Sequence, residues 1–599
     1  MIRVFFRFFQ YLKSFREIIG AKVYLVFILS SLIGFVDSVG IVMFFPVLEG
    51  IDNIQKDIPD NYILHQIKSL LAFLNISESV ATVLILIIFI FIFKFLLSFL
   101  SAWMVADLRA KLLMQLKSKL LTAFSKMQYL YYSEKSSGYF VNLFNEQVTS
   151  ASGAFVNLIQ LFTQLVYATI YVIFAFIVSW QLAIAALFIG VIVFILMLRL
   201  NIFAQKLSKK SAYESGFIAK NIIQVIQGYK YFLASGNLNK FNMVIRNSID
   251  RLSNWHYKIL TTGGFVSTIR EPIAVISIAS IIYIHIAFLG YKISVVLISI
   301  ILFYRTLNSI LAIQLRSHLV MESIVGLELI IEELETLSLN EYEETKNLED
   351  SNFFFKSEIE LRDVSFFYSS NNIGVSNLNF RIPKNSSLAI VGPSGSGKST
   401  IIDLLTLILE PKKGNIYIDG VCTNEINGNK WREKIGFVSQ DCVIVDDTIA
   451  NNIALFSKKE NKRIMDAAVK ANIFSFINSL PDKFETKVGE RGVKLSGGQR
   501  QRLFISRELY KEPEILILDE ATSSLDSESE KNIQSTIDAL LGKVTVIIVA
   551  HRLSTIKDVD NIIYIDNGEI IDIGNFNYLS KNSKKFKRLI KDQFINNED

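Results

Sequence analysis

Six apolar stretches in the first half of the chain are each long enough to cross a lipid bilayer, which takes about 20 residues of helix. Their approximate ranges are 22–46, 80–104, 155–179, 182–203, 264–289 and 292–314. The third and fourth stretches are separated only by residues 180–181, and the fifth and sixth only by residues 290–291, so neither pair has room for a folded loop. The pattern predicts six membrane-spanning helices.

The pattern changes near residue 350. Short β-rich runs then alternate with glycine-containing turns and charged helices, which is typical of a soluble α/β domain. We therefore expect a transmembrane domain over residues 1–335, a linker over 336–356 and an α/β domain with a helical subdomain over 357–599.

Composition and charge support a membrane protein. The chain is 51% hydrophobic, which excludes a disordered or fibrous protein, and its net charge is +6. Lys and Arg gather at the N-terminus and in the loops 105–154 and 204–263, whereas the loop 47–79 is acidic. The positive-inside rule places the basic loops in the cytoplasm, together with residues 357–599. The charge thus reflects membrane topology, and we expect no nucleic-acid partner.

The first 20 residues mix aromatic and basic side chains and show no small-residue cleavage site. They are either an interfacial helix, with aromatics in lipid and cations on anionic headgroups, or a frayed basic terminus.

A phosphate-binding loop follows a buried strand, 387–391, and precedes an apolar helix from Ile401. Glycines in such a loop allow backbone N–H groups to surround phosphate oxygens at a helix N-terminus. Lys398 is expected to reach the β- and γ-phosphates, and the Ser399 hydroxyl to hold Mg²⁺. The candidate ATP-binding residues of this loop are Gly392, Ser394, Gly395, Ser396, Gly397, Lys398, Ser399 and Thr400.

Two further strands end in candidate catalytic residues. The strand 515–518 is followed by Asp519, which suits the Mg²⁺ shell, and by Glu520, which is placed to polarise the attacking water. The strand 544–550 is followed by His551. Alone, a histidine at this place is usually structural; after a phosphate-binding loop and an Asp-Glu pair it becomes a site candidate.

The segment Leu495-Ser496-Gly497-Gly498-Gln499 opens a helix 24 positions before Asp519. Its glycines expose a second set of backbone N–H groups at a helix N-terminus. One nucleotide cannot occupy both phosphate sites of one domain. The simplest arrangement is a head-to-tail dimer in which each ATP lies between two subunits.

These motifs, in this order, resemble the ATP-binding cassette (ABC) transporters, and in particular exporters that fuse one membrane domain to one ATPase domain. The resemblance covers essentially the whole chain and implies a homodimer with two competent ATP sites. It assigns Tyr368 to adenine stacking, Gln440 to sensing of Mg²⁺ and γ-phosphate, and His551 to the switch position. It also implies that the signature Ser496, Gly497, Gly498 and Gln499 contacts ATP, and that Ser524-Leu525-Asp526 forms the D-loop.

Further features of this family concern coupling between the domains. The long cytoplasmic loops of such exporters end in short coupling helices, which here are expected near Ser133–Tyr139 and Tyr229–Leu238. The segment Glu490-Arg491-Gly492 resembles a loop that contacts the membrane domain, while Val445 stands where many exporters carry Phe. The resemblance implies alternating access driven by ATP. A soluble ABC ATPase is disfavoured by the six spans, and an importer of the same architecture stays open.

The cargo is suggested by ionisable residues at membrane depth, which are functional candidates by default. Lys94, Arg270 and Arg305 form a candidate cationic lining for an anionic headgroup, unless Asp37 pairs with Lys94 or Arg305. Apolar residues between Ile63 and Leu74 predict an amphipathic helix on the outer surface.

That helix, the stretch Asp37–Pro46 and the pair Tyr304-Arg305 are similar to bacterial lipid-linked oligosaccharide flippases. The expected function is therefore flipping of an anionic lipid-linked oligosaccharide across the bacterial cytoplasmic (inner) membrane. The alternative is a multidrug or lipid exporter.

Overall fold

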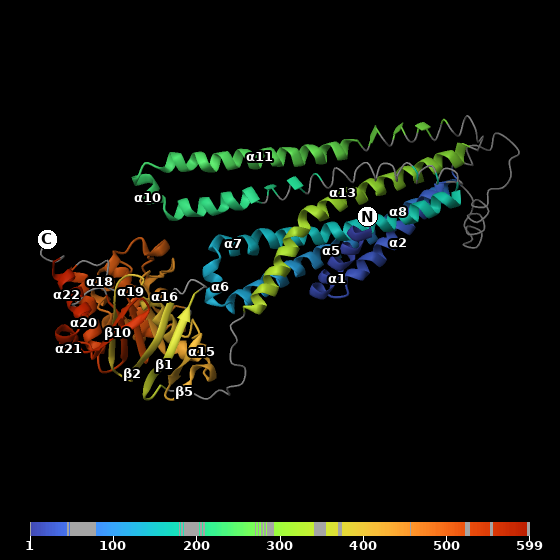
Figure 1. The fold of residues 1–599 in the computed structure, drawn as a ribbon. Helices are drawn as coiled ribbons and strands as arrows, with labels where there is room; N and C mark the ends of the chain where they lie inside the picture. The colour runs from blue at the N-terminus through green and yellow to red at the C-terminus, as the bar shows by residue number, and fades with distance from the viewer. Residues whose placement is uncertain are drawn as a thin grey trace, which may run out of the picture. The chain divides into compact units, whose positions relative to one another are not determined.

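The computed structural model describes residues 2–44, 80–178, 213–269, 293–340, 355–368, 374–455, 457–520, 527–550 and 555–595, with Val47 and scattered positions between 180 and 292. Contacts divide the chain into two compact units (Figure 1). One comprises Met1–Met127 and Glu134–Glu341, and the other comprises Gln128–Ser133 and Tyr342–Asp599.

The first unit is helical. Its main helices are α1 (Ile2–Ile19), α2 (Val23–Val42), α5 (Val80–Ser125), α7 (Ser137–Asn142), α8 (Val148–Val178), α10 (Tyr229–Ala234), α11 (Leu238–Thr268) and α13 (Ile293–Leu339). Within the described ranges, four helical stretches are long and apolar enough to cross a membrane, at Val23–Val42, Val80–Ser125, Ser137–Ile177 and Ile300–Leu339. The predicted spans 182–203 and 264–289 lie largely outside the described residues, as does the predicted outer helix at 61–74.

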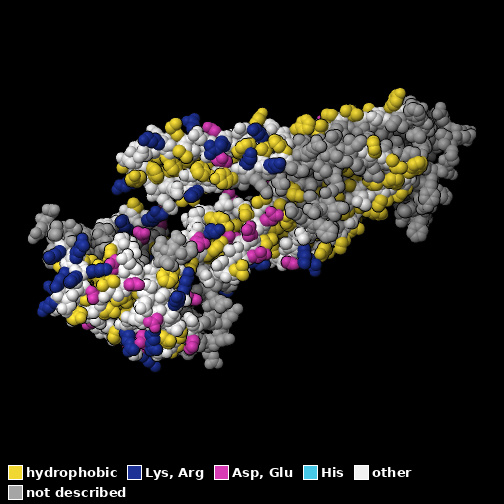
Figure 2. Space-filling model, in the orientation of Figure 1, with side chains coloured by type: hydrophobic (Ala, Val, Ile, Leu, Met, Phe, Trp, Pro, Cys, Tyr) yellow, Lys and Arg dark blue, Asp and Glu magenta, His cyan; other side chains and the backbone are white. Residues whose placement is uncertain are grey.

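The helices α5 and α13 are longer than a bilayer is thick. They contain 46 and 47 residues; at about 1.5 Å per residue each measures roughly 70 Å, against about 30 Å of hydrocarbon. The N-terminal half of α5 exposes large apolar side chains such as Phe89 and Phe99, as a lipid-facing helix does. Its C-terminal half instead buries Leu108, Leu112 and Leu116 at four-residue spacing. In Figure 2 Lys and Arg side chains gather around α10 and α11, and hydrophobic side chains predominate among the coloured residues at the opposite end of the helices.

Close packing of α8 against α13 forms the centre of the helical unit. The Ser150 hydroxyl donates to the Ser323 carbonyl at 3.0 Å, and Arg316 donates to Asn157 at 3.2 Å. Gly326 permits this approach, because a Cβ there would lie 2.7 Å from the Gln147 carbonyl oxygen. The two helices are antiparallel, and polar contacts join the N-terminal half of α8 to the C-terminal half of α13.

The second unit contains two sheets. Its strands are β1 (Glu358–Phe367), β2 (Gly374–Pro383), β3 (Ser387–Val391), β4 (Lys413–Ile418), β5 (Val421–Cys422), β6 (Ile435–Val438), β7 (Ile515–Asp519), β8 (Thr545–Val549), β9 (Asn561–Asp566) and β10 (Glu569–Gly574). The first sheet has the order β2-β1-β4-β5 and is antiparallel. The second has the order β10-β9-β3-β8-β7-β6, in which only the β10–β9 pair is antiparallel.

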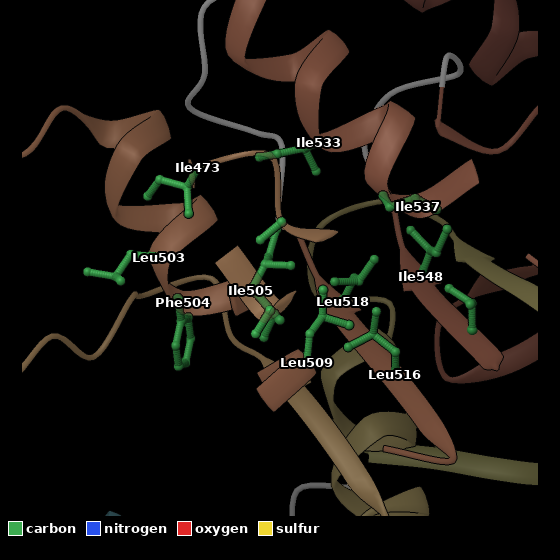
Figure 3. Close-up of a cluster of buried hydrophobic side chains, with 14 of the residues drawn as sticks. Ile473, Leu503, Phe504, Ile505, Leu509, Leu516, Leu518, Ile533, Ile537 and Ile548 are labelled. Atoms are coloured by element: carbon green, nitrogen blue, oxygen red, sulfur yellow. The ribbon is translucent and has the colours of Figure 1, made fainter. Parts of the chain in front are cut away.

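Helices cover the parallel sheet on both faces, so its central strands are apolar throughout. The main helices of this unit are α14 (Lys398–Leu405), α15 (Gly428–Glu433), α16 (Ile449–Ala454), α17 (Asn461–Lys470), α18 (Phe474–Ser479), α19 (Gly497–Tyr510), α20 (Ser527–Leu540), α21 (Phe576–Asn582) and α22 (Lys584–Ile595). Leu516 and Leu518 point into one buried cluster with α19 and α20, shown in Figure 3, while Ile515 and Ile517 point into the other. This core fixes the C-terminal ends of β3 and β7, where the candidate site residues lie.

The expected coupling segments differ in detail from the structure. The stretch near Ser133–Tyr139 contains the end of one short helix, α6 (Tyr129–Glu134), and the start of another, α7. By its contacts, Gln128–Ser133 groups with the second unit. The second expected segment contains α10, which ends four residues before Leu238.

Candidate functional site

The phosphate-binding loop joins β3 to α14 and is shaped by two glycines that cannot be replaced. A Cβ at Gly392 would lie 2.1 Å from the Ile565 carbonyl oxygen. Gly397 has φ +104°, and a Cβ there would lie 2.6 Å from a Val375 methyl. The loop is therefore pressed against β9 and the start of β2, which leaves its other side free to surround a ligand.

Two polar side chains of this loop are buried without a charged partner in hydrogen-bond contact. The Lys398 ammonium is 6% exposed and donates to the carbonyls of Gly392 at 3.0 Å and Pro393 at 2.9 Å. Burial lowers its pKa, opposed by the charges of Glu520 and Asp519. The Ser396 hydroxyl is buried and has no hydrogen-bond partner among the described residues. A buried cation and an orphaned hydroxyl in a cradle of glycines fit the phosphates of a nucleotide.

Acidic residues face this loop from the end of β7. Asp519 is the last residue of the strand, and Glu520 follows with φ +51°, its N–H bonded to the Val549 carbonyl at 3.1 Å. The Gln440 amide donates to the Glu520 carboxylate at 2.9 Å. The structure thus brings Glu520 and Gln440 together. Carboxylate, amide and hydroxyl oxygens, such as those of Asp519, Gln440 and the exposed Ser399, are ligands that Mg²⁺ prefers.

Tyr368 follows the end of β1 and is 41% exposed. Its ring packs edge-on against Phe366, with centroids 5.1 Å apart, and its hydroxyl is 3.2 Å from that of Thr400 on α14. These two contacts hold the ring beside the helix that follows the phosphate-binding loop, where it could stack on adenine.

The signature segment caps α19. The Ser496 hydroxyl accepts from the Gln499 N–H at 3.3 Å, and the Gln499 side chain accepts from the Ser496 N–H at 2.9 Å. This reciprocal capping box fixes the first turn of the helix. Gly497 has open space around it, so its N–H lies where a second ligand can approach.

A buried arginine positions α19 relative to the segment after Gln440. Arg507 is 2% exposed and donates to the carbonyls of Val443 and Asn452, and to the Asn452 side chain. The Asn452 side chain in turn accepts from the Val445 N–H at 3.0 Å and donates to the Val445 carbonyl at 2.9 Å. The position of Val445 is therefore fixed by these polar contacts.

The charged residues at membrane depth form a cluster across four helices. Lys94 on α5 lies 2.5 Å from the carboxylate of Asp37 on α2, which is only 2% exposed. Tyr171 on α8 also donates to Asp37. Asp37 therefore pairs with Lys94, and the charge of Lys94 is compensated. Arg305 on α13 lies near Tyr171 and makes no ion pair with any described residue.

Other expected site residues fall on positions that the structure does not describe. Arg270, His551 and the segment 524–526 lie outside the described residues. One residue of interest was missed from the sequence, namely Asp403 on α14, an acidic side chain among the buried Ile401, Ile402 and Leu404. The signal was present, since a carboxylate within an apolar stretch beside a phosphate-binding loop is unusual.

Known proteins share both halves of the chain. The family described as "ABC transporter transmembrane region" matches residues 23–311, and the family "ABC transporter" matches residues 375–523. The chain is similar to an "ATP-dependent lipid A-core flippase" of Saccharophagus degradans, with 33% identity covering 79% of this chain and 80% of that protein. A flippase of the same description from Haemophilus influenzae (strain ATCC 51907 / DSM 11121 / KW20 / Rd) is 31% identical, covering 83% and 85%.

Not all relatives carry that description. The "Heterocyst differentiation ATP-binding protein HepA" of a Nostoc species is 31% identical, covering 75% of this chain and 74% of that protein. The solved "Structure of a bacterial Atm1-family ABC exporter with ATP bound" has a TM-score of 0.78 and covers 96% of this chain and 98% of its own, at 22% identity, which shows the shared fold. The expected resemblance is confirmed, and with it ATP hydrolysis coupled to transport. The chain belongs to the ABC transporters, and in this chain a membrane domain is fused to an ATPase domain.

Proposed function

We propose that this ABC exporter acts as a homodimer that uses ATP to flip an anionic, phosphate-bearing glycolipid from the cytoplasmic to the outer leaflet. The ATPase domain then faces the cytoplasm of a bacterial cell, below the inner membrane. The proposal rests on the nucleotide site, on the membrane cluster and on the relatives.

At the nucleotide site each side chain has a distinct role. Lys398 leaves the loop carbonyls and meets the phosphates, with the N–H groups of the loop around them. Gln440 holds Glu520 so that its carboxylate orients the attacking water. Ser399, Gln440 and Asp519 supply the oxygens for Mg²⁺, which neutralises phosphate charge when bound.

The proposal of a homodimer is supported by the two candidate phosphate sites of one domain. A test is to mix subunits that carry Lys398→Ala with subunits that carry Ser496→Arg. The mixed dimer keeps one intact site and has one site with both lesions, so mixing should recover part of the lost ATPase activity. Normal activity of either pure variant would contradict shared sites.

The proposal that the cargo is an anionic glycolipid is supported by Arg305. This guanidinium lies about 12 residues into α13, or roughly 18 Å along the helix, and is not neutralised by a described carboxylate. A cation at this depth is costly unless it serves a partner, and Arg305 has no ion-pair partner among the described residues. A phosphate offers charge-assisted hydrogen bonds that lipid tails do not. The lipid-linked oligosaccharide expected from the sequence is such an anionic lipid, and the names of the relatives, which are lipid A-core flippases, support a lipid cargo.

The direct test compares Arg305→Ala with Arg305→Lys in lipid nanodiscs. A phosphate-bearing glycolipid should stimulate the ATPase of wild type and of the lysine variant, whereas the alanine variant keeps its basal rate and loses stimulation. The exposed Lys119→Ala on α5 is the control for loss of a cation elsewhere. Equal stimulation of the alanine variant, or stimulation by neutral and cationic amphiphiles only, would favour a multidrug exporter instead.

A further inference from the structure

Two lysines from separate parts of the helical unit meet on one indole ring. The Lys258 ammonium, three residues after Trp255 on α11, lies 5.0 Å from the centroid of the Trp255 ring. The Lys210 ammonium lies 4.7 Å from the same centroid and comes from a helical residue that precedes the helical stretch 213–227. Both lysines are exposed, and all three residues belong to the same compact unit. Two like charges are thus close together where a ligand can reach them.

No carboxylate neutralises these two lysines among the residues that the structure describes. Glu214, one turn after Lys210, is already bound by Arg251, which donates to both of its oxygens at 2.7 and 3.1 Å. Asp250 lies on α11 about 140° around the helix axis from Trp255. Like charges repel each other, and an exposed cation–π contact is weak. A bound anion would therefore stabilise this arrangement.

The indole N–H of Trp255 adds a third donor. It forms no hydrogen bond with any residue in the described part of the chain. Ammonium and indole groups donate hydrogen bonds and accept none. A phosphate has several oxygens and can accept charge-assisted hydrogen bonds from more than one cation at once. Three donors around one ring therefore fit a phosphate.

The three residues lie at the level of lipid headgroups. On α11, Leu260 and Phe265 are 70% and 54% exposed, as on a lipid-facing surface. Trp255 precedes Leu260 by five residues, or about 8 Å of helix. Lys210 follows Phe203, which is 49% exposed, by seven residues, or about 10 Å. A headgroup layer is roughly 5–8 Å thick, lysine side chains extend toward it, and tryptophan is typical of it.

We propose that Trp255, Lys210 and Lys258 bind the phosphate headgroup of an anionic lipid, in the leaflet that the sequence predicts to be cytoplasmic. The two lysines bind the phosphate oxygens from two sides of the ring's surroundings, and the indole N–H donates a further hydrogen bond. The inference goes beyond the proposed cargo and does not depend on Arg305, because a phospholipid such as phosphatidylglycerol carries the same phosphate. Where the lipid is the cargo itself, the site collects it on the side from which it is moved.

The experiment measures the binding of single lipids to the full-length protein in a neutral detergent by native mass spectrometry. The anionic probes are phosphatidylglycerol and a phosphate-bearing glycolipid, and the probes without net charge are phosphatidylcholine and the dephosphorylated glycolipid. Lys210→Gln combined with Lys258→Gln should raise the Kd of the anionic lipids about ten- to thirtyfold, as loss of two lysines near an anionic lipid surface predicts. The Kd values of the other two lipids should not change.

Two further pairs of substitutions separate binding from folding. Lys230→Gln combined with Lys240→Gln, at exposed positions of α10 and α11, makes the same change of charge away from Trp255 and should keep the wild-type Kd. Lys210→Arg combined with Lys258→Arg retains both charges and should also keep it.

The outcomes identify the lipid as well as the site. A raised Kd for both anionic lipids assigns the site to phosphate headgroups in general, whereas a raised Kd for only one of them assigns it to that lipid. Unchanged Kd values in the glutamine pair at 210 and 258, or an equal loss in the control pair, would overturn the inference. The phosphatidylglycerol result holds whether or not the transported lipid is a glycolipid, so failure of the proposed function can be told apart from failure of this site.

Discussion

Replacing Lys94 with methionine tests whether the charge cluster at membrane depth is structural. The variant keeps an unbranched chain as far as the ε position and removes the ammonium group with its charge. Asp37 is 2% exposed and lies 2.5 Å from the Lys94 ammonium, so its carboxylate would remain buried with Tyr171 as its one remaining side-chain donor among the described residues.

The expected loss follows from this geometry. Removing one partner of a buried ion pair costs about 3–5 kcal/mol, because the other charge stays uncompensated. The Tyr171 bond retains part of the solvation, which places the loss near the lower end, about 3 kcal/mol. At roughly 2–4 °C per kcal/mol for a large domain, the midpoint of thermal unfolding should fall by about 6–12 °C.

The assay is tryptophan fluorescence during heating in nanodiscs, with Lys119→Met as the exposed control on the same helix. Adding Asp37→Asn to Lys94→Met removes the orphaned charge, and should recover most of the loss. If the single variant is as stable as wild type, or the double is no better than the single, the pair is not structural. The charge of Lys94 would then be available to the cargo.

Three other changes test the ATPase unit. Glu520→Gln should lower kcat at least about a hundredfold with ATP binding kept, as measured by steady-state hydrolysis and nucleotide titration, because only the group that orients water is lost. Arg507→Met should destabilise the unit by about 3 kcal/mol in a denaturant series, since three buried hydrogen bonds disappear, and Arg507→Lys should recover part of this. The pKa of Asp403 rises on folding from 3.8 to about 6. The folded protein therefore becomes less stable as the pH rises between these two values, because the ionised carboxylate is disfavoured in its buried site. Asp403→Asn should stabilise the fold by about 1–2 kcal/mol at pH 8, after allowance for partial exposure, and hardly at all near pH 4. An equal effect of Asp403→Asn at both pH values would contradict this cause.

The sequence predicts most clearly the features that are local. The phosphate-binding loop, the strand before Asp519 and the capped signature helix each depend on a few consecutive residues, and the structure contains them where expected. The choice of Asp37 as the partner of Lys94 depends on how α2 meets α5, which no local pattern encodes.

Other features depend on contacts between distant segments. The sequence places a coupling helix near Ser133–Tyr139, whereas the structure divides this stretch between α6, which ends at Glu134, and α7, which begins at Ser137. The contact between the Tyr368 and Thr400 hydroxyls joins residues 32 positions apart, and only the fold brings them together. The spacing of apolar residues gives helices and strands, but the partners of buried polar groups follow from tertiary packing.

The most direct test of the proposed function follows a fluorescent phosphate-bearing glycolipid between the leaflets of liposomes that contain the purified protein. ATP supplied on the side of the ATPase domain should move the lipid to the opposite leaflet, and neither Glu520→Gln nor Arg305→Ala should do so. The same sugar lipid without its phosphate should stay in place. If the neutral lipid moves as fast as the phosphorylated one, or if neither moves while ATP is hydrolysed, the protein is not an exporter of anionic glycolipids.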